Sequence, residues 1–197
     1  MSELSPPEIK SLISFVKESL GIPEKLASLI TPFYKKEYLK KDDFLLKKGA
    51  YCHKMYFVET GYLRFFSYSD KKVITHWIFG KSQLVADVAS FFFQEPAKWN
   101  IQALTDTHVY AITFDNYQHL RKKIPEWDNY EKLFLVKLIS ALENRVYALV
   151  SMSAEERYQY LFNADPEMFN ALPLNFLASM LGITPETLSR IRRKYSK

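Results

Sequence analysis

The chain has 197 residues, of which 48% are hydrophobic, and a net charge of +5, so it can bury a sizeable core in one large domain or two small ones. No run of about 18 apolar residues is present, and the start Met-Ser-Glu-Leu-Ser-Pro-Pro-Glu lacks a basic segment followed by an apolar one. The single cysteine, Cys52, excludes an intramolecular disulfide framework. We therefore expect a cytoplasmic protein with no membrane partner.

The first part of the chain predicts two helices. Residues 8–20 carry apolar side chains at helical spacing, and Gly21 and Pro23 follow as helix-ending residues. A second, shorter helix is expected from Lys25 to Phe33. These helices precede a change of pattern at about Lys36.

From about Lys36 to Phe114 the pattern predicts strands. Short aromatic and β-branched runs end near glycines, at Gly49, Gly61 and Gly80, and such runs are typical of an antiparallel sandwich or jelly roll. The expected strands cover residues 44–46, 54–58, 62–68, 73–79, 101–103 and 109–114, and a helical connection opens at Phe114.

A long helix is predicted from Glu126 to about Ser151, after Pro125. One set of its apolar residues alternates in steps of four and three, which is the heptad spacing of a two-stranded coiled coil: Leu135, Ile139, Leu142, Val146 and Leu149. A second stripe, Phe134, Leu138 and Ala141, could cover the body of the same chain. A helix packed only on its own domain is the alternative, but the two separate stripes favour a homodimer.

The last 45 residues predict helices. Ser153-Ala154-Glu155-Glu156 begins one with a capping-box pattern, residues 163–173 read as a polar loop with Pro166 and Pro173, and Leu177 to Lys194 reads as two short helices around a tight turn. Gly182 can take the left-handed backbone that ends the first of them. Thr184 suits the N-cap and Pro185 the first position of the second.

The second of these helices would bury Leu188 and Ile191 and present a basic outer face. From Glu186 to Lys197 there are five positive residues and one negative, a net of +4 out of +5 for the chain. Such a surface suits a recognition helix in the major groove of DNA, although a hairpin that merely closes a domain would also show a polar face. The candidate DNA contacts are Thr184, Glu186, Thr187, Ser189, Arg190, Arg192, Arg193 and Lys194.

The run from Leu181 to Ile191 resembles the helix-turn-helix of Crp/Fnr-type bacterial transcription regulators. Glu186 and Arg190 match two base-contacting positions of that family, whereas Pro185 replaces an arginine that contacts a base in some members. The resemblance implies an α+β fold that comprises an antiparallel β-roll of the cyclic-nucleotide-binding type with flanking helices over residues 1–125, a dimerisation helix over 126–151 and a helix-turn-helix domain over 152–197. We expect no C-terminal wing after the recognition helix.

The resemblance also implies the partners. They are double-stranded DNA, a second copy of the chain, RNA polymerase and an unidentified small effector. The protein is expected to be a regulator and not an enzyme.

In that family a Gly-Glu pair and an Arg-Ser/Thr-Ala segment cradle a cyclic nucleotide. By ungapped comparison Ala86 and Asp87 stand for the first pair, and Ala97, Lys98 and Trp99 stand for the second segment. Lys98 lacks the bidentate fork of arginine, so the sequence favours a degenerate cradle. The candidate effector pocket is Asp87, Val88, Ser90, Lys98, Trp99 and Asn100, and the neighbouring Phe91, Phe92 and Phe93 either line a pocket for another ligand or belong to the core. A regulator that does bind a cyclic nucleotide or a related effector is the alternative.

Other chemistries find little support in the sequence. One cysteine cannot supply the roughly four thiolates of an iron–sulfur cluster. Cys52-His53 is a candidate haem-ligand pair, but the scattered His76, His108 and His119 show no metal-binding spacing. The competing class is a cupin-like β-roll metalloenzyme with an accessory helical domain, which would want a His-x-His cluster. We expect no cofactor, no metal site and no catalytic residues.

Overall fold

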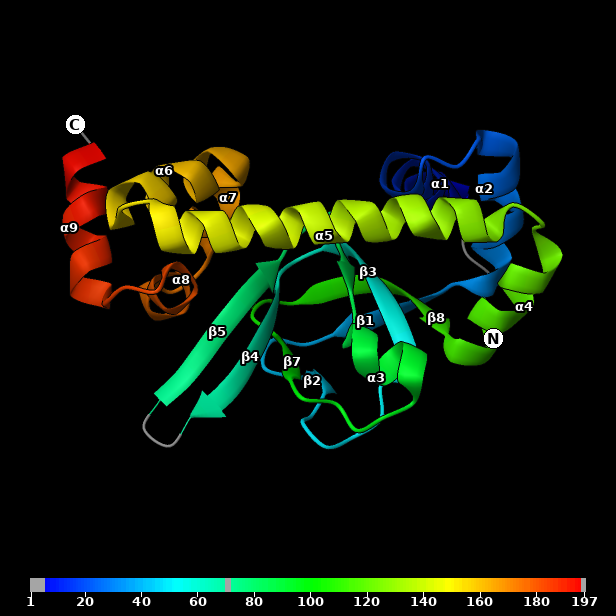
Figure 1. The fold of residues 1–197 in the computed structure, drawn as a ribbon, viewed down its shortest axis with the longest axis horizontal. Helices are drawn as coiled ribbons and strands as arrows, with labels where there is room; N and C mark the ends of the chain where they lie inside the picture. The colour runs from blue at the N-terminus through cyan, green and yellow to red at the C-terminus, as the bar shows by residue number, and fades with distance from the viewer. Residues whose placement is uncertain (1–5, 70–71, 196–197) are drawn as a thin grey trace.

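The computed structural model describes residues 6–69 and 72–195. Two antiparallel sheets lie beneath one long helix, α5, as Figure 1 shows. Helices α1, α2 and α4 gather at one end of α5, and α6 to α9 gather at the other. The chain order is α1 (Pro6–Leu20), α2 (Glu24–Ile30), a 3-10 turn (Thr31–Phe33), β1 (Lys35–Leu39), β2 (Phe44–Leu46), β3 (Lys54–Thr60), β4 (Leu63–Ser69), β5 (Lys72–Phe79), β6 (Leu84–Val85), α3 (Val88–Phe93), β7 (Asn100–Ala103), β8 (Thr107–Thr113), α4 (Phe114–Lys123), α5 (Trp127–Ser151), α6 (Ala154–Ala164), α7 (Pro166–Ala171), α8 (Leu174–Leu181) and α9 (Pro185–Tyr195).

The strands form two four-stranded sheets with the orders β1-β8-β3-β6 and β2-β7-β4-β5. On β3, Met55 and Phe57 are directly opposite Ile112 and Tyr110 of β8, so these four side chains share one face of the first sheet. Phe57 stacks on Phe15 of α1, which identifies this face as the one that the helices cover. Burial on both faces of β3 explains its nearly continuous apolar run.

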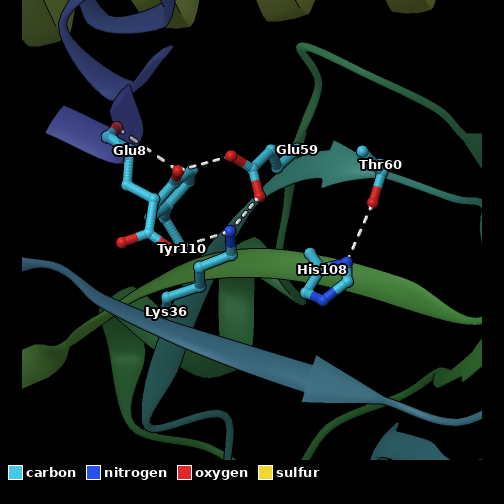
Figure 2. A network of polar contacts seen from close by, with 6 residues as sticks. All are labelled: Glu8, Lys36, Glu59, Thr60, His108 and Tyr110. Atoms are coloured by element: carbon cyan, nitrogen blue, oxygen red, sulfur yellow. Dashed lines mark hydrogen bonds and ion pairs between the residues drawn. The ribbon is translucent and has the colours of Figure 1, made fainter. Parts of the chain in front are cut away.

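A polar network fastens α1 to the edge of the first sheet (Figure 2). The Tyr110 hydroxyl donates to Glu59 Oε1 at 2.6 Å and lies 3.3 Å from the Glu8 carbonyl oxygen. Lys36 Nζ lies 2.9 Å from Glu8 Oε1 and 2.7 Å from Glu59 Oε2. Nearby, Thr60 and His108 form a hydrogen bond of 3.2 Å. Helix α1 is therefore held by both apolar stacking and ion pairs.

Most of the predicted elements are confirmed. The antiparallel strands, the long helix and the helix pair around Gly182 all occur within two residues of their expected bounds or overlap them closely. The expected helix over residues 25–33 is interrupted, because α2 ends at Ile30 and Pro32 lies in the 3-10 turn, where a proline cannot donate to a helical hydrogen bond.

The prediction of a polar loop over residues 163–173 is wrong. Helix α7 occupies residues 166–171, with Pro166 at its first turn and Asp165 as its N-cap, whose carboxylate accepts from Met168 N–H at 2.9 Å. Met168 and Phe169 are buried, so the segment contributes to the core. Strands β1 and β6 and helix α3 are not among the predicted elements, because each has at most six residues and no clear period.

The C-terminal helices and the second sheet share one hydrophobic cluster. Ile78 and Leu104 from the sheet side are buried together with Leu177, Met180 and Leu188 from the helices. Helix α8 lies against β5, where Thr75 N–H donates to Ser179 Oγ at 2.9 Å. The C-terminal helices are thus docked onto the sheet through a common core.

Candidate nucleic-acid interface and effector region

The turn between α8 and α9 has the predicted geometry. Gly182 follows α8 in the left-handed conformation, with φ 70° and ψ 32°, and Ile183 N–H donates to the Ala178 carbonyl at 3.0 Å. Thr184 Oγ1 accepts from Thr187 N–H at 3.2 Å, and α9 begins at Pro185. These local interactions set the angle between the two helices, because the left-handed Gly182 ends α8 and the Thr184 cap begins α9 only two residues later.

Helix α9 is strongly amphipathic. Leu188 and Ile191 are buried against the other C-terminal helices. Of the predicted DNA contacts, Thr184, Glu186, Arg190, Arg193 and Lys194 are exposed, and Thr187, Ser189 and Arg192 are half-buried. Five of the eight residues are thus exposed, and the three half-buried ones, Thr187, Ser189 and Arg192, are less accessible on the same segment.

Two acidic residues, Glu186 and Glu155, reduce the positive charge of this surface. The Glu186 carboxylate accepts hydrogen bonds from its own backbone N–H and from Thr184, and both lower its pKa. Lys194 Nζ lies 2.6 Å from Glu155 Oε1 of α6, a hydrogen bond that raises the pKa of Lys194 and lowers that of Glu155. Glu186 is therefore an exposed anionic acceptor, and Lys194 is paired with Glu155.

The residues of the predicted effector pocket surround α3, and their buried polar groups already have partners in the chain. Asp87 is 2% exposed, and its carboxylate accepts from Ser90 N–H at 3.2 Å and from Lys98 N–H at 2.9 Å. The Ser90 hydroxyl accepts from Cys52 N–H and donates to the Glu95 carbonyl. Asn100 Oδ1 accepts from Lys48 N–H at 3.0 Å.

The other predicted pocket residues, Lys98, Val88 and Trp99, lie in different surroundings. Lys98 extends to solvent, with its ammonium 3.7 Å from Glu95, and Val88 is exposed. The Trp99 ring lies 4.4 Å from the His76 ring and 5.6 Å from the Phe65 ring. Phe91 is fully buried, whereas Phe93 is 76% exposed, so the three phenylalanines do not line one cavity.

The predicted seam of α5 lies on its free side. Leu135, Ile139, Leu142, Val146 and Leu149 are between 37% and 65% exposed. The packing stripe is confirmed for Phe134 and Leu138, which are packed against the core or line its edge, but Ala141 is exposed. Arg145 and the buried Ala148 continue the inward face instead.

Sequence reasoning missed two arginines at the C-terminal end of α8. The Arg145 guanidinium of α5 donates to the Met180 carbonyl, and the Arg157 Nε of α6 donates to the Leu181 carbonyl at 3.0 Å. Burial, and then the charge of Arg157, lower the pKa of Arg145. The available signal was a charged residue at position 145 in step with the inward stripe Phe134 and Leu138.

Within residues 6–69 and 72–195, no three His, Cys, Asp or Glu side chains lie close enough to hold a metal ion. Over the same ranges, no helix is long and apolar enough to cross a membrane.

Comparisons with known proteins identify the domain and the fold. Residues 36–123 match the cyclic nucleotide-binding domain family. A comparison with curated proteins found no match.

Several solved structures share the fold. FixK2 from Bradyrhizobium japonicum is 15% identical, with a TM-score of 0.69 over 82% of this chain and 83% of that one. The c-di-GMP-responsive global regulator CLP from Xanthomonas campestris is 14% identical, with a TM-score of 0.66 over 88% of this chain and 92% of that one. A CooA mutant from Carboxydothermus hydrogenoformans is 18% identical, with a TM-score of 0.62 over 92% and 82%. Residues 36–123 therefore resemble a cyclic nucleotide-binding domain, and the chain shares its overall fold with these regulators.

Proposed function

We propose that the protein is a homodimeric transcription regulator that binds a specific, two-fold symmetric DNA site. The observation that carries this proposal is the exposed basic face of α9, on which Glu186 and Arg190 lie one helical turn apart while Leu188 and Ile191 are buried. A helix supported in this way can enter the major groove without losing its own core contacts.

Glu186 and Arg190 are the residues that read sequence. An arginine can donate two hydrogen bonds to the O6 and N7 of guanine, and a glutamate can accept from the N4 amino group of cytosine. Hydrogen bonds from its own N–H and from Thr184 lower the pKa of Glu186, so the carboxylate is available as an anionic acceptor. Arg193 is exposed three residues after Arg190, near the C-terminal end of α9. It would contact phosphate and contribute affinity without specificity.

Dimerisation is the second part of the proposal. Three seam residues, Ile139, Leu142 and Val146, line a shallow groove together with Glu143, Tyr147, Val150 and Ser151. A second α5 with the same heptad spacing is the proposed complementary surface. Two helix-turn-helix units related by two-fold symmetry would contact half-sites about 34–36 Å apart, one turn of DNA.

The sensor domain is proposed to respond to an effector other than cyclic AMP. The support is the pairing of Asp87 with Ser90 and Lys98 backbone N–H groups and the lack of an arginine at position 97.

The test is selection of duplexes from a random library by the full chain, followed by sedimentation of the free protein and of the complex. We expect a dimer at micromolar concentration and selected sites with two-fold symmetry. A monomer that selects single half-sites would contradict the dimer, and selection of no sequence at all would contradict specific DNA binding.

A further inference from the structure

The docking of the helix-turn-helix against the sensor sheet depends on a small number of polar contacts. Most of the shared surface is apolar, and apolar contacts alone tolerate sliding. Hydrogen bonds from side chains fix one position, because they have directional geometry. The polar contacts therefore identify the residues that set the position of α8.

Arg145 is the residue among them that joins three elements. It belongs to α5, and its Nη2 group donates to the Met180 carbonyl of α8 and lies 3.5 Å from the His76 carbonyl of β5. Its guanidinium is also 5.1 Å from the centre of the Trp77 ring, on the same strand. One side chain of the proposed dimerisation helix thus contacts both the sensor sheet and the first helix of the DNA-binding pair.

The chemistry of the α8 end suits a cation. The last carbonyl groups of a helix have no partner within the helix, and the helix dipole places partial negative charge there. Arg157 donates to the Leu181 carbonyl and to the Met152 carbonyl at 2.6 Å, so a second arginine binds the same end from α6. Both arginines satisfy acceptors that would otherwise be buried without a donor.

The position of the His76 carbonyl, which lies 3.5 Å from Arg145 Nη2, follows from an irregularity in the sheet. Phe65 pairs with Trp77 and Phe66 pairs with Thr75, so His76 is an extra residue on β5 and forms a bulge. The bulge directs the His76 carbonyl away from β4 and toward Arg145, and Thr75 N–H is used by Ser179 of α8. The His76 ring in turn packs edge-on against Trp99, in the region where the effector is expected.

We propose that Arg145 is a positioning residue that holds the helix-turn-helix at a fixed place relative to the α5 seam, and that the His76–Trp99 contact ties this place to the effector region. The inference rests on the proposed function, because the consequence of the positioning is measured on DNA. Two recognition helices fit two half-sites together only when their separation is set in advance, so loss of Arg145 reduces simultaneous binding and leaves binding to one half-site intact.

The experiment compares the full chain with Arg145→Gln on two duplexes, a selected two-fold site and the same sequence with one half-site scrambled. We expect Arg145→Gln to lose roughly tenfold or more on the two-fold site and to change little on the half-site. Arg145→Lys keeps a cation at the α8 carbonyl and should recover part of the loss. Arg121→Gln, which removes an arginine of α4 from an exposed ion pair with Asp128 of α5, is the control and should behave as wild type.

Small-angle scattering provides a readout that does not depend on DNA. We expect Arg145→Gln to have a larger mean radius of gyration than wild type, since the helix-turn-helix no longer keeps one position on β5. If Arg145→Gln does not fold by circular dichroism, Ser179→Ala, which removes the second polar contact, takes its place in both measurements.

The outcomes separate the two proposals. Equal loss on both duplexes, or no loss on either with unchanged scattering, overturns the role of Arg145. Absence of specific binding by the wild type overturns the proposed function, and in that case the scattering comparison alone decides whether Arg145 holds the docked position.

Discussion

Arg190 is the side chain on which the proposed sequence specificity depends most. It is exposed on α9, one turn after Glu186. We expect Arg190→Ala to reduce discrimination between the selected site and random duplex by about 1–3 kcal/mol, because one bidentate contact to guanine is lost. Titrations of both duplexes at several salt concentrations measure this effect.

Arg193→Ala is the matched control for Arg190→Ala. It removes the same charge from an exposed position of the same helix, and it should weaken both duplexes equally while reducing the salt slope by about one unit. If Arg190→Ala behaves in the same way as Arg193→Ala, Arg190 contacts phosphate and the assigned reading position is wrong.

His76 makes the stability of the protein depend on pH. Burial, and then the charge of Arg145, lower the pKa of His76 below its usual value of 6.5. In the unfolded chain the ring binds a proton near pH 6.5, whereas in the folded chain it does so only at lower pH. Stability contributed by the neutral ring is therefore present above pH 6.5 and is lost as the pH falls from 6.5 through the folded pKa.

Urea unfolding at several pH values measures this effect. We expect the wild type to lose stability between pH 7 and pH 5 more steeply than His76→Gln, which keeps a polar side chain of similar size. Equal slopes for the two proteins would mean that His76 is not the titrating group.

Helix α5 packs one face against the core and exposes an apolar face, and we propose that the exposed face forms the dimer. Leu142 is 65% exposed, so Leu142→Lys should leave the fold intact and place like charges opposite each other in the proposed dimer. We expect sedimentation equilibrium to show a monomer. Asn144→Lys adds the same charge at an exposed position outside the seam and should remain dimeric; a dimeric Leu142→Lys would place the interface elsewhere.

The segment from α3 to β7 contains residues of the proposed effector region. Asp87 caps α3 and holds the Lys98 backbone, and the Lys98 ammonium is exposed near Glu95. No positive side chain in this segment is therefore preset to bind a cyclic phosphate. We expect calorimetry to show no cyclic AMP binding tighter than about 10 µM. A clear micromolar isotherm would show that the segment rearranges around the nucleotide.

At the scale of the whole molecule, the shared core makes the sensor sheet and the C-terminal helices unfold together. Ile78 of β5 is buried with Leu177 and Leu188. We expect urea unfolding to give coincident transitions by tryptophan fluorescence, which reports on the sheet and on α5, and by far-ultraviolet circular dichroism, which reports on all helices.

Ile78→Ala tests this coupling directly. It should destabilise the protein by about 2–5 kcal/mol and shift both transitions together, since the cavity lies between the two parts. A shift in the fluorescence transition alone would show that the helices unfold independently.

Local chemistry was sufficient to predict the helix-turn-helix from the sequence. Gly182, Thr184 and Pro185 each act within a few residues, so the turn and the start of α9 follow from backbone preferences and capping. The heptad spacing of α5 and the short strands were predictable for the same reason, because periodicity records which side of an element is apolar. The polar loop expected over residues 163–173 failed because Asp165 and Pro166 begin a helix as readily as they occupy a loop, and only burial of Phe169 decides between them.

The fold class, the order of the elements and the outer face of α9 follow from the sequence, since they depend on patterns within a few turns of chain. Tertiary structure alone decided that α8 lies against β5, that Asp87 caps α3 instead of facing an open cradle, and that Arg145 bonds to Met180. These contacts join residues far apart in the chain or depend on an unexpected bulge at His76 and an unexpected helix at α3. No local pattern records such partners, because their meeting depends on how the sheets, the long helix and the C-terminal helices pack together.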